Sequence, residues 1–79
     1  MPTVVTEGQY RFVIRTHEKE FEPPHVHVLI GGGDDECRIR LNDGTYMDDP
    51  PPGQFRDILD VYEQHAEEIR ATWDRIHQR

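Results

Sequence analysis

Two histidines are the residues of this sequence best suited to chemistry. His25 and His27 alternate with valines in the segment Glu22-Pro23-Pro24-His25-Val26-His27-Val28. A β-strand projects side chains two residues apart onto one face, so we expect the two imidazoles to lie side by side. The diproline before them has a fixed φ and favours an extended connector. The segment therefore predicts a functional site without naming a reaction.

Three interpretations of the histidine pair are open. Two neutral imidazoles can share a divalent metal such as zinc, with a third ligand from His17, His77 or an acidic residue. One imidazole can instead accept a proton while the other donates one, as metal-free phosphodiester cleavage requires. In the third interpretation the pair caps the sheet edge by bonding to connector carbonyls, a purely structural role. An H-x-H pair without a placed third ligand has low specificity, so no cofactor is expected.

A basic sheet face is predicted around the histidine pair. If the apolar residues of each strand point at a helix, strand alternation places the basic residues between them on the opposite face of the sheet. Acidic residues are expected mainly elsewhere, since residues 42–79 hold nine acidic and four basic side chains. Guanidinium groups bind carboxylates and phosphates, so this face is predicted to bind a partner or an anionic ligand. The alternative is a solvated face without a ligand. The predicted contact residues are Arg11, Arg15, His17, His25, His27, Arg38 and Arg40.

Period-two patterns predict the strands that position these residues. They cover residues 10–17, 25–30 and 37–41, and Thr45-Tyr46-Met47 is a candidate fourth strand. Glycines at 31–33 favour a β-hairpin between the second and third strands, and Asn42-Asp43-Gly44 favours a further turn. The residues predicted to face the core are Tyr10, Phe12, Ile14, Val26, Val28, Ile30, Cys37, Ile39 and Leu41.

The C-terminal part is predicted to be helical. A proline-rich connector, residues 48–53, separates a strand-rich part, 1–47, from residues 54–79. Apolar residues then recur on one face at about 100° per residue, which permits one long helix or two helices with a bend near Gln64-His65. The predicted fold is a single α+β domain, an antiparallel meander of three or four strands packed against these helices. The helical stripe consists of Phe55, Ile58, Leu59, Tyr62, Ala66, Ile69, Trp73 and Ile76.

Composition restricts the class of protein. With 79 residues, 34% hydrophobic and 32% charged, the chain lies near the polar limit for independent folding, so a homodimer or a second protein is expected to add buried area. A net charge of -7 argues against nucleic-acid binding except through the local basic face. The single cysteine, Cys37, excludes an internal disulfide and is expected in the core. With no signal-peptide pattern and no apolar run that spans a bilayer, a cytoplasmic location is expected.

Several segments resemble a family of small bacterial proteins, domain-of-unknown-function family 4160. The resemblance rests on Met1-Pro2-Thr3-Val4-Val5, Tyr10-Arg11-Phe12, the EPPHVHV string at 22–28, and Glu67-Glu68-Ile69 with Trp73. It covers nearly the whole chain. Members are often encoded beside a second small protein that looks like a DNA-binding regulator, which implies a toxin–antitoxin-like pair. The resemblance implies a fold and supplies no catalytic residues.

One departure from the family pattern concerns the start of the helix. Relatives commonly place a capping side chain before a proline there, whereas Pro50-Pro51-Pro52-Gly53 offers no such cap, so a frayed first turn is expected. His65, with Glu68 as a capping partner, favours the bend near that position. Taken together, the sequence predicts a binding or regulatory module. The alternative is a small hydrolase or ribonuclease that uses His25 and His27.

Overall fold

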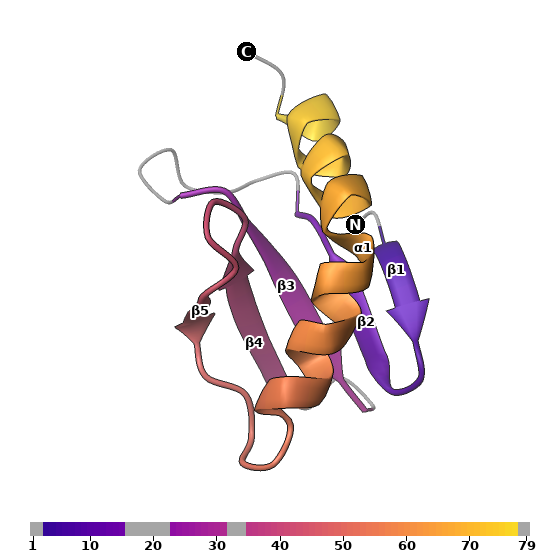
Figure 1. The fold of residues 1–79 in the computed structure, drawn as a ribbon. Coiled ribbons are helices and arrows are strands. Elements are labelled where there is room, and N and C mark those ends of the chain that lie inside the picture. Colours follow the sequence, from indigo (N-terminus) through magenta and orange to yellow (C-terminus); the bar gives the residue numbers. More distant parts are fainter. Residues whose placement is uncertain (1–2, 16–22, 32–34, 78–79) are drawn as a thin grey trace.

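The fold of this chain is a five-stranded antiparallel sheet with one long helix on one face. The structure, a computed structural model, describes residues 3–15, 23–31 and 35–77. The sheet order follows the chain, and helix α1 (Phe55–Ile76) crosses the sheet (Figure 1). The predicted α+β meander is confirmed, with five strands in place of three or four. The strands are β1 (Thr3–Glu7), β2 (Tyr10–Val13), β3 (His25–Ile30), β4 (Asp35–Arg40) and β5 (Tyr46–Asp48).

Strand β1 is the element that sequence reasoning missed. It pairs with β2 as an antiparallel hairpin around Gly8, whose φ of 60 suits glycine. The run Thr3-Val4-Val5-Thr6 is rich in β-branched residues and precedes this glycine, so the signal was present. Strand β2 ends at Val13, earlier than the predicted end at residue 17, and residues 16–22 lie outside the described part of the chain.

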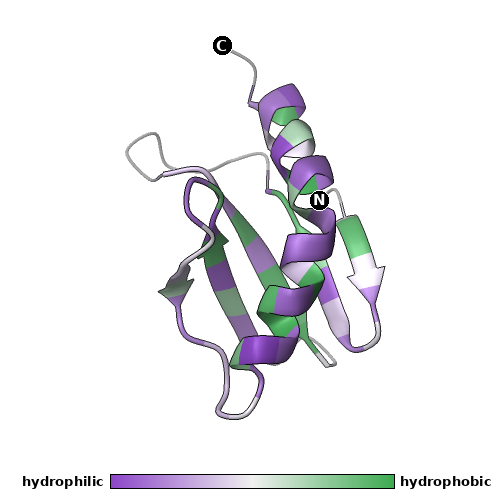
Figure 2. Cartoon of the chain, in the orientation of Figure 1, coloured by the Kyte–Doolittle hydropathy of each residue, from purple (hydrophilic) through white to green (hydrophobic). Residues whose placement is uncertain are grey.

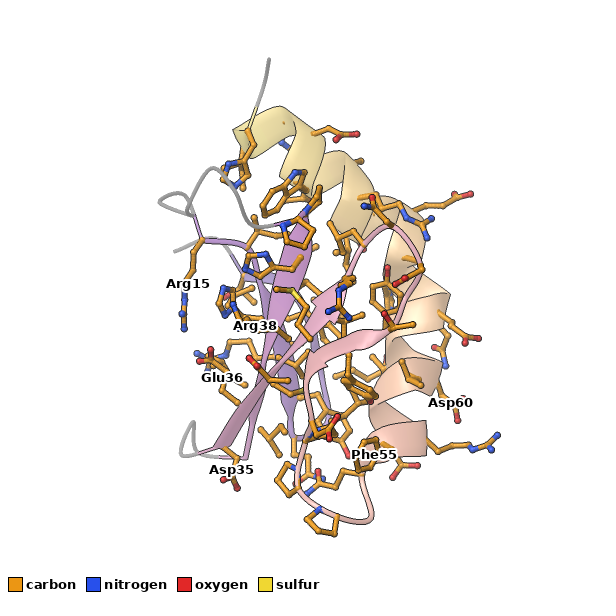
Figure 3. All side chains as sticks on the ribbon, turned by 90° about the vertical axis from the view of Figure 1, so that its left-hand side faces the viewer. Arg15, Asp35, Glu36, Arg38, Phe55 and Asp60 are labelled. Atoms are coloured by element: carbon orange, nitrogen blue, oxygen red, sulfur yellow. The ribbon has the colours of Figure 1, made fainter. Side chains whose placement is uncertain are left out.

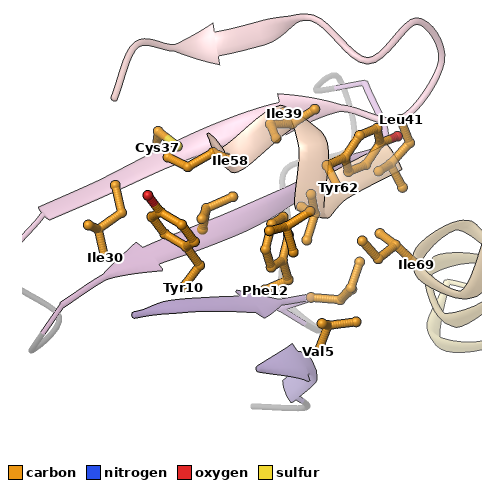
Figure 4. Packing of buried hydrophobic residues seen from close by; sticks show 14 of the residues in the cluster. Val5, Tyr10, Phe12, Ile30, Cys37, Ile39, Leu41, Ile58, Tyr62 and Ile69 are labelled. Carbon is orange, nitrogen blue, oxygen red and sulfur yellow. The ribbon is translucent and has the colours of Figure 1, made fainter. Parts of the chain in front are cut away.

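Strand register confirms the predicted core set. Phe12 lies opposite Val28, which lies opposite Cys37, so the three side chains share a face. Figure 4 shows this face packing against Ile58, Tyr62 and Ile69. Alternation along β3 and β4 is visible as successive hydrophobic and hydrophilic bands in Figure 2. All nine residues predicted to face the core are buried, and the most exposed of them, Tyr10, is 7% exposed.

Helix α1 is continuous, so of the two arrangements that the apolar stripe left open the structure has the single long helix, without the bend near Gln64-His65 that His65 favoured. No glycine or proline interrupts Phe55–Ile76, and therefore nothing breaks the hydrogen-bond ladder. The expected lack of a side-chain cap is confirmed at Gln54. Among the described residues, no helix has both the length and the apolar character needed to cross a membrane.

The predicted helical stripe is wrong at its first residue. Phe55 is 42% exposed, and its ring packs edge-to-face against Tyr46 with centroids 5.4 Å apart. The Tyr46 hydroxyl donates a hydrogen bond of 2.7 Å to the Phe55 carbonyl, which fixes the first turn beside β5 instead of over the middle of the sheet. Val61 and Thr72, which were outside the predicted stripe, are buried.

Candidate partner-binding face

The predicted site residues lie together on the sheet face opposite the middle of α1, which we call the outer face, and His25 at one end of this face also contacts Trp73 near the C-terminal end of α1. Register places Leu29 between Arg11 and Glu36, and places His27 between Val13 and Arg38. Figure 3 shows Arg15, Glu36 and Arg38 gathered on this side, away from the helix. His17 lies outside the described residues. The six predicted site residues that the structure describes are Arg11, Arg15, His25, His27, Arg38 and Arg40.

His25 is fully buried and bonded to the connector. Its Nδ1–H donates to the Pro23 carbonyl over 2.8 Å, which is the contact that the structural interpretation predicts. The ring centroid lies 4.9 Å from that of His27 and 5.7 Å from that of Trp73. Since proline fixes the connector immediately before the strand, His25 anchors the start of β3 against the C-terminal end of α1.

His27 is 4% exposed and is held by a carboxylate. Its Nδ1–H donates to Oε2 of Glu36 over 2.9 Å, and Oε1 of Glu36 accepts from Nη2 of Arg15, also over 2.9 Å. Partial burial acts to raise the pKa of Glu36, but the hydrogen bond from His27 and the charge of Arg15 together hold that pKa below its ordinary value. Sequence reasoning missed Glu36, although extending the period-two pattern back from Arg38 places it on the outer face.

A second carboxylate neutralises Arg38. Its guanidinium makes a two-point ion pair with Asp48, whose carboxylate accepts from Nε and, at 3.3 Å, from Nη2. This hydrogen bonding holds the pKa of Asp48 below its ordinary value. The expectation that acidic residues lie mainly elsewhere therefore fails for Glu36 and Asp48. Pairing of β4 with β5, which sets Arg38 opposite Asp48, is the physical reason.

Two arginines of the outer face make no direct ion pair with a carboxylate among the described residues, although Arg40 is linked to Asp43 through the Thr45 hydroxyl. Arg40 is half-buried, and its Nη1 donates to the Thr45 hydroxyl at 3.2 Å and to the Tyr46 carbonyl at 2.9 Å. Arg11 is exposed. From strand spacings, their Cα atoms lie about 16 Å apart, because they are four residues apart along the sheet and two strands apart across it.

The metal interpretation finds no ligand set in the part of the chain that the structure describes. No group of three or more His, Cys, Asp and Glu residues there is arranged to hold an ion. His77, one candidate third ligand, stacks on Trp73 with centroids 3.9 Å apart and donates from Nε2 to the Arg15 carbonyl over 3.1 Å. Burial raises the pKa of Cys37 to about 12, so its thiol stays protonated at neutral pH.

The fold and the site define a small α+β protein with one helix-covered sheet face and one polar face. Residues 10–74 match the family model described as Domain of unknown function (DUF4160). This match covers most of the chain, which therefore belongs to that family. Comparisons with curated proteins and with solved structures gave no match. The family description assigns no activity, so function is argued from the outer face.

Proposed function

We propose that this chain is a binding module that holds an acidic segment of a partner protein on its outer face. The observation that carries the proposal is the presence of two guanidinium groups, Arg11 and Arg40, that make no direct ion pair with a carboxylate among the described residues. Arg15 and Arg38 on the same face are already neutralised by Glu36 and Asp48. Guanidinium groups pair strongly with carboxylates, so Arg11 and Arg40 supply the attraction.

The separation of the two arginines favours a macromolecular ligand. A single phosphate or carboxylate does not bridge the two groups, because Nη1 of Arg40 is held on the β5 side by Thr45 and Tyr46, away from Arg11 on β2. Nucleic acid carries negative charge along its whole length and is repelled by a chain with net charge -7. A partner protein can instead present one acidic segment while the rest of its surface is neutral or basic. We propose that this partner is the second small protein of a toxin–antitoxin-like pair.

Charge reversal with a matched control tests the proposal. In the Arg11→Glu/Arg40→Glu variant the outer face loses both guanidinium groups. The control, Arg56→Glu/Arg75→Glu, makes the same change in net charge at two exposed positions of α1. A partner isolated with the unmutated protein would be purified and its Kd measured for all three proteins, after circular dichroism has confirmed their folding. We expect binding at least tenfold weaker for the outer-face variant and unchanged for the control.

Two outcomes would overturn the binding proposal. Equal Kd values for both double variants would show that the outer face is not the contact surface. A protein that binds only a second copy of itself, with no other partner in any preparation, would replace the two-protein pair by a homodimer.

A second candidate function is a small hydrolase or ribonuclease, and one observation favours it. The hydrogen bond from Nδ1–H of His27 to Glu36 makes Nε2 the basic nitrogen, an arrangement also found in carboxylate–histidine pairs that act as general bases. Exposures of 0% for His25 and 4% for His27 leave little surface for substrate contact. This candidate requires turnover of a phosphodiester or RNA substrate that His27→Gln abolishes and His65→Gln preserves.

A metal-dependent form of this activity has its own test. Elemental analysis would compare chelator-free, untagged protein with the His25→Ala/His27→Ala variant. Stoichiometric zinc present in the first and lost from the second would support a metallohydrolase. Without such a difference, and without turnover in a broad substrate screen, the hydrolase candidate is excluded.

A further inference from the structure

Strand β1 forms one edge of the sheet. It pairs with β2 on one side, and no strand pairs with its other side in the described part of the chain (Figure 1). Edge strands present backbone N–H and C=O groups to a further strand, and proteins commonly block them with short strands, proline or lysine. The opposite edge, β5, has three residues and is followed closely by Pro50-Pro51-Pro52. The five residues of β1 include no proline or lysine, and their pairing with β2 is regular from Val5 to Glu7, so β1 is the more open edge.

The hydrogen bonds of β2 show which residue of β1 faces the free edge. The N–H of Gly31 donates to the Gln9 carbonyl over 2.9 Å, so Gln9 directs this carbonyl towards β3. Backbone groups alternate in direction along an antiparallel strand, and Tyr10 therefore directs its own towards β1, where its partner is Glu7. Thr6 precedes Glu7 and is exposed. By the same alternation, Thr6 directs its N–H and C=O away from the sheet.

The side chain beside this edge position is Arg11. Thr6 pairs with Arg11, so both side chains lie on the outer face, and the next residue across the sheet is the uncharged Leu29. The carboxylate beyond it, Glu36, already accepts hydrogen bonds from two other side chains. A residue added opposite Thr6 would project onto the same face, with its Cα about 10 Å from that of Arg11. Glutamate at that position can reach the guanidinium across the short Thr6 side chain, because glutamate and arginine are both long.

We propose that the β1 edge binds the acidic partner as an added antiparallel strand, with a carboxylate opposite Thr6 paired to Arg11. This inference rests on the proposed function and specifies how the partner contacts the Arg11 side of the outer face. Backbone hydrogen bonds at Thr6 supply affinity that is independent of side-chain type, and Arg11 selects an acidic segment. Arg40 lies on β4, three strands from β1, and contacts a part of the partner beyond this strand.

A defined peptide tests the inference on the unmutated protein. The probe is a ten-residue peptide in which glutamate alternates with valine or threonine, and its control has glutamine in place of each glutamate. NMR chemical-shift changes measure binding, and amide hydrogen exchange of Thr6 is compared with and without the peptide. We expect exchange at Thr6 to slow by about tenfold at saturation, because its N–H becomes hydrogen-bonded. The glutamine peptide should bind about threefold more weakly, the size of one partly exposed ion pair.

Two variants of Thr6 separate the backbone from the side chain. Thr6→Pro removes the outward N–H and should weaken peptide binding about tenfold. Proline is accepted on edge strands where the N–H faces solvent, so circular dichroism should show an unchanged fold. Thr6→Val keeps the N–H and the side-chain size, and should bind as the unmutated protein does. Arg11→Gln should bind the two peptides equally.

The outcomes separate the inference from the function on which it rests. Peptide binding without slower exchange at Thr6, or equal binding by Thr6→Pro and Thr6→Val, overturns the edge inference and leaves the proposed function intact. Failure of both peptides to bind also overturns it, whereas the Kd comparison of the charge-reversal variants decides the proposed function separately.

Two further outcomes would assign the edge to another occupant. Equal affinity of the unmutated protein for the glutamate and glutamine peptides would overturn the selection of an acidic segment. A dimer of the unmutated protein that Thr6→Pro converts to a monomer would show that a second copy of the chain occupies the edge in place of the partner.

Discussion

The two faces of the sheet bury their central residues by different physical means. Under α1, the fully buried Phe12, Val28 and Ile39 contact other apolar side chains. On the outer face, His25 and His27 are almost equally buried, but hydrogen bonds to a carbonyl and a carboxylate hold them. Apolar packing is non-directional and independent of charge, whereas the outer-face contacts depend on geometry and protonation. We therefore expect pH to change the contribution of the outer face to the free energy of unfolding, and we expect cavity-creating substitutions to have their largest effect on the helix-covered face.

The largest expected effect is in the helix-covered face. Phe12→Ala removes a fully buried ring, and the resulting cavity should lower the free energy of unfolding by about 3–5 kcal/mol. Urea denaturation should give the same loss at pH 8 and pH 6, because no titratable group contributes. Phe55→Ala is the matched control, since 42% of Phe55 is exposed and its loss should cost under about 1 kcal/mol. Similar losses for both variants would contradict the inner-face packing.

The next effect is in the buried part of the outer face. His25→Ala deletes a fully buried ring together with its hydrogen bond to Pro23, and should cost about 2–3 kcal/mol of unfolding free energy. Trp73 is the only tryptophan and lies against this ring, so its fluorescence should also change. Unchanged fluorescence together with unchanged stability would show that the histidine is not packed as described.

The loss of stability in Glu36→Gln should depend on pH, unlike the loss in Phe12→Ala. The pKa of Glu36 is lowered from its ordinary value of 4.5, so the charged carboxylate stabilises the folded state above that pH. This contribution is lost as the pH falls through the lowered pKa. We expect the variant to be about 1 kcal/mol less stable at pH 6. The difference should vanish in acid, and a difference that persists there would contradict the electrostatic origin.

The smallest effect is expected at the sheet edge. Asp48→Asn removes the ion pair with Arg38, but half of the Asp48 side chain is exposed, so the cost should be about 0.5 kcal/mol. Thermal unfolding at low and high salt should show that added salt reduces this difference. A loss above about 2 kcal/mol would contradict this expectation and would make the ion pair between Arg38 and Asp48 one of the main stabilising contacts of the outer face.

Much of the architecture could be predicted because its signals are local. Alternation in Tyr10-Arg11-Phe12 and in Val26-His27-Val28 assigns each side chain to a face through backbone geometry alone. The periodic apolar stripe likewise predicts a helix. Phe55 was misassigned because helical periodicity predicts only the direction in which a side chain points. It does not predict how far the sheet extends beneath the helix.

The sequence predicted which residues lie on the outer face, but it did not predict which of them pair with each other. Which arginines are neutralised depends on long-range pairing: Glu36 is 21 residues from Arg15, and Asp48 is 10 residues from Arg38. The hydrogen bond from His77 to the Arg15 carbonyl joins residues 62 apart. No local pattern encodes which strands become neighbours or which side chains then lie within reach of each other.

The sequence by itself determined the strand faces, the helical segment and the resemblance to a family, because these follow from the order of residue types along the chain. The tertiary structure decided the continuity of α1, the burial of His25 and His27, and the sharing of Glu36 between two positively chargeable groups. The physical reason is that burial and ion pairing are properties of the neighbours that surround a side chain in space, and those neighbours are set only when the five strands and the helix pack together.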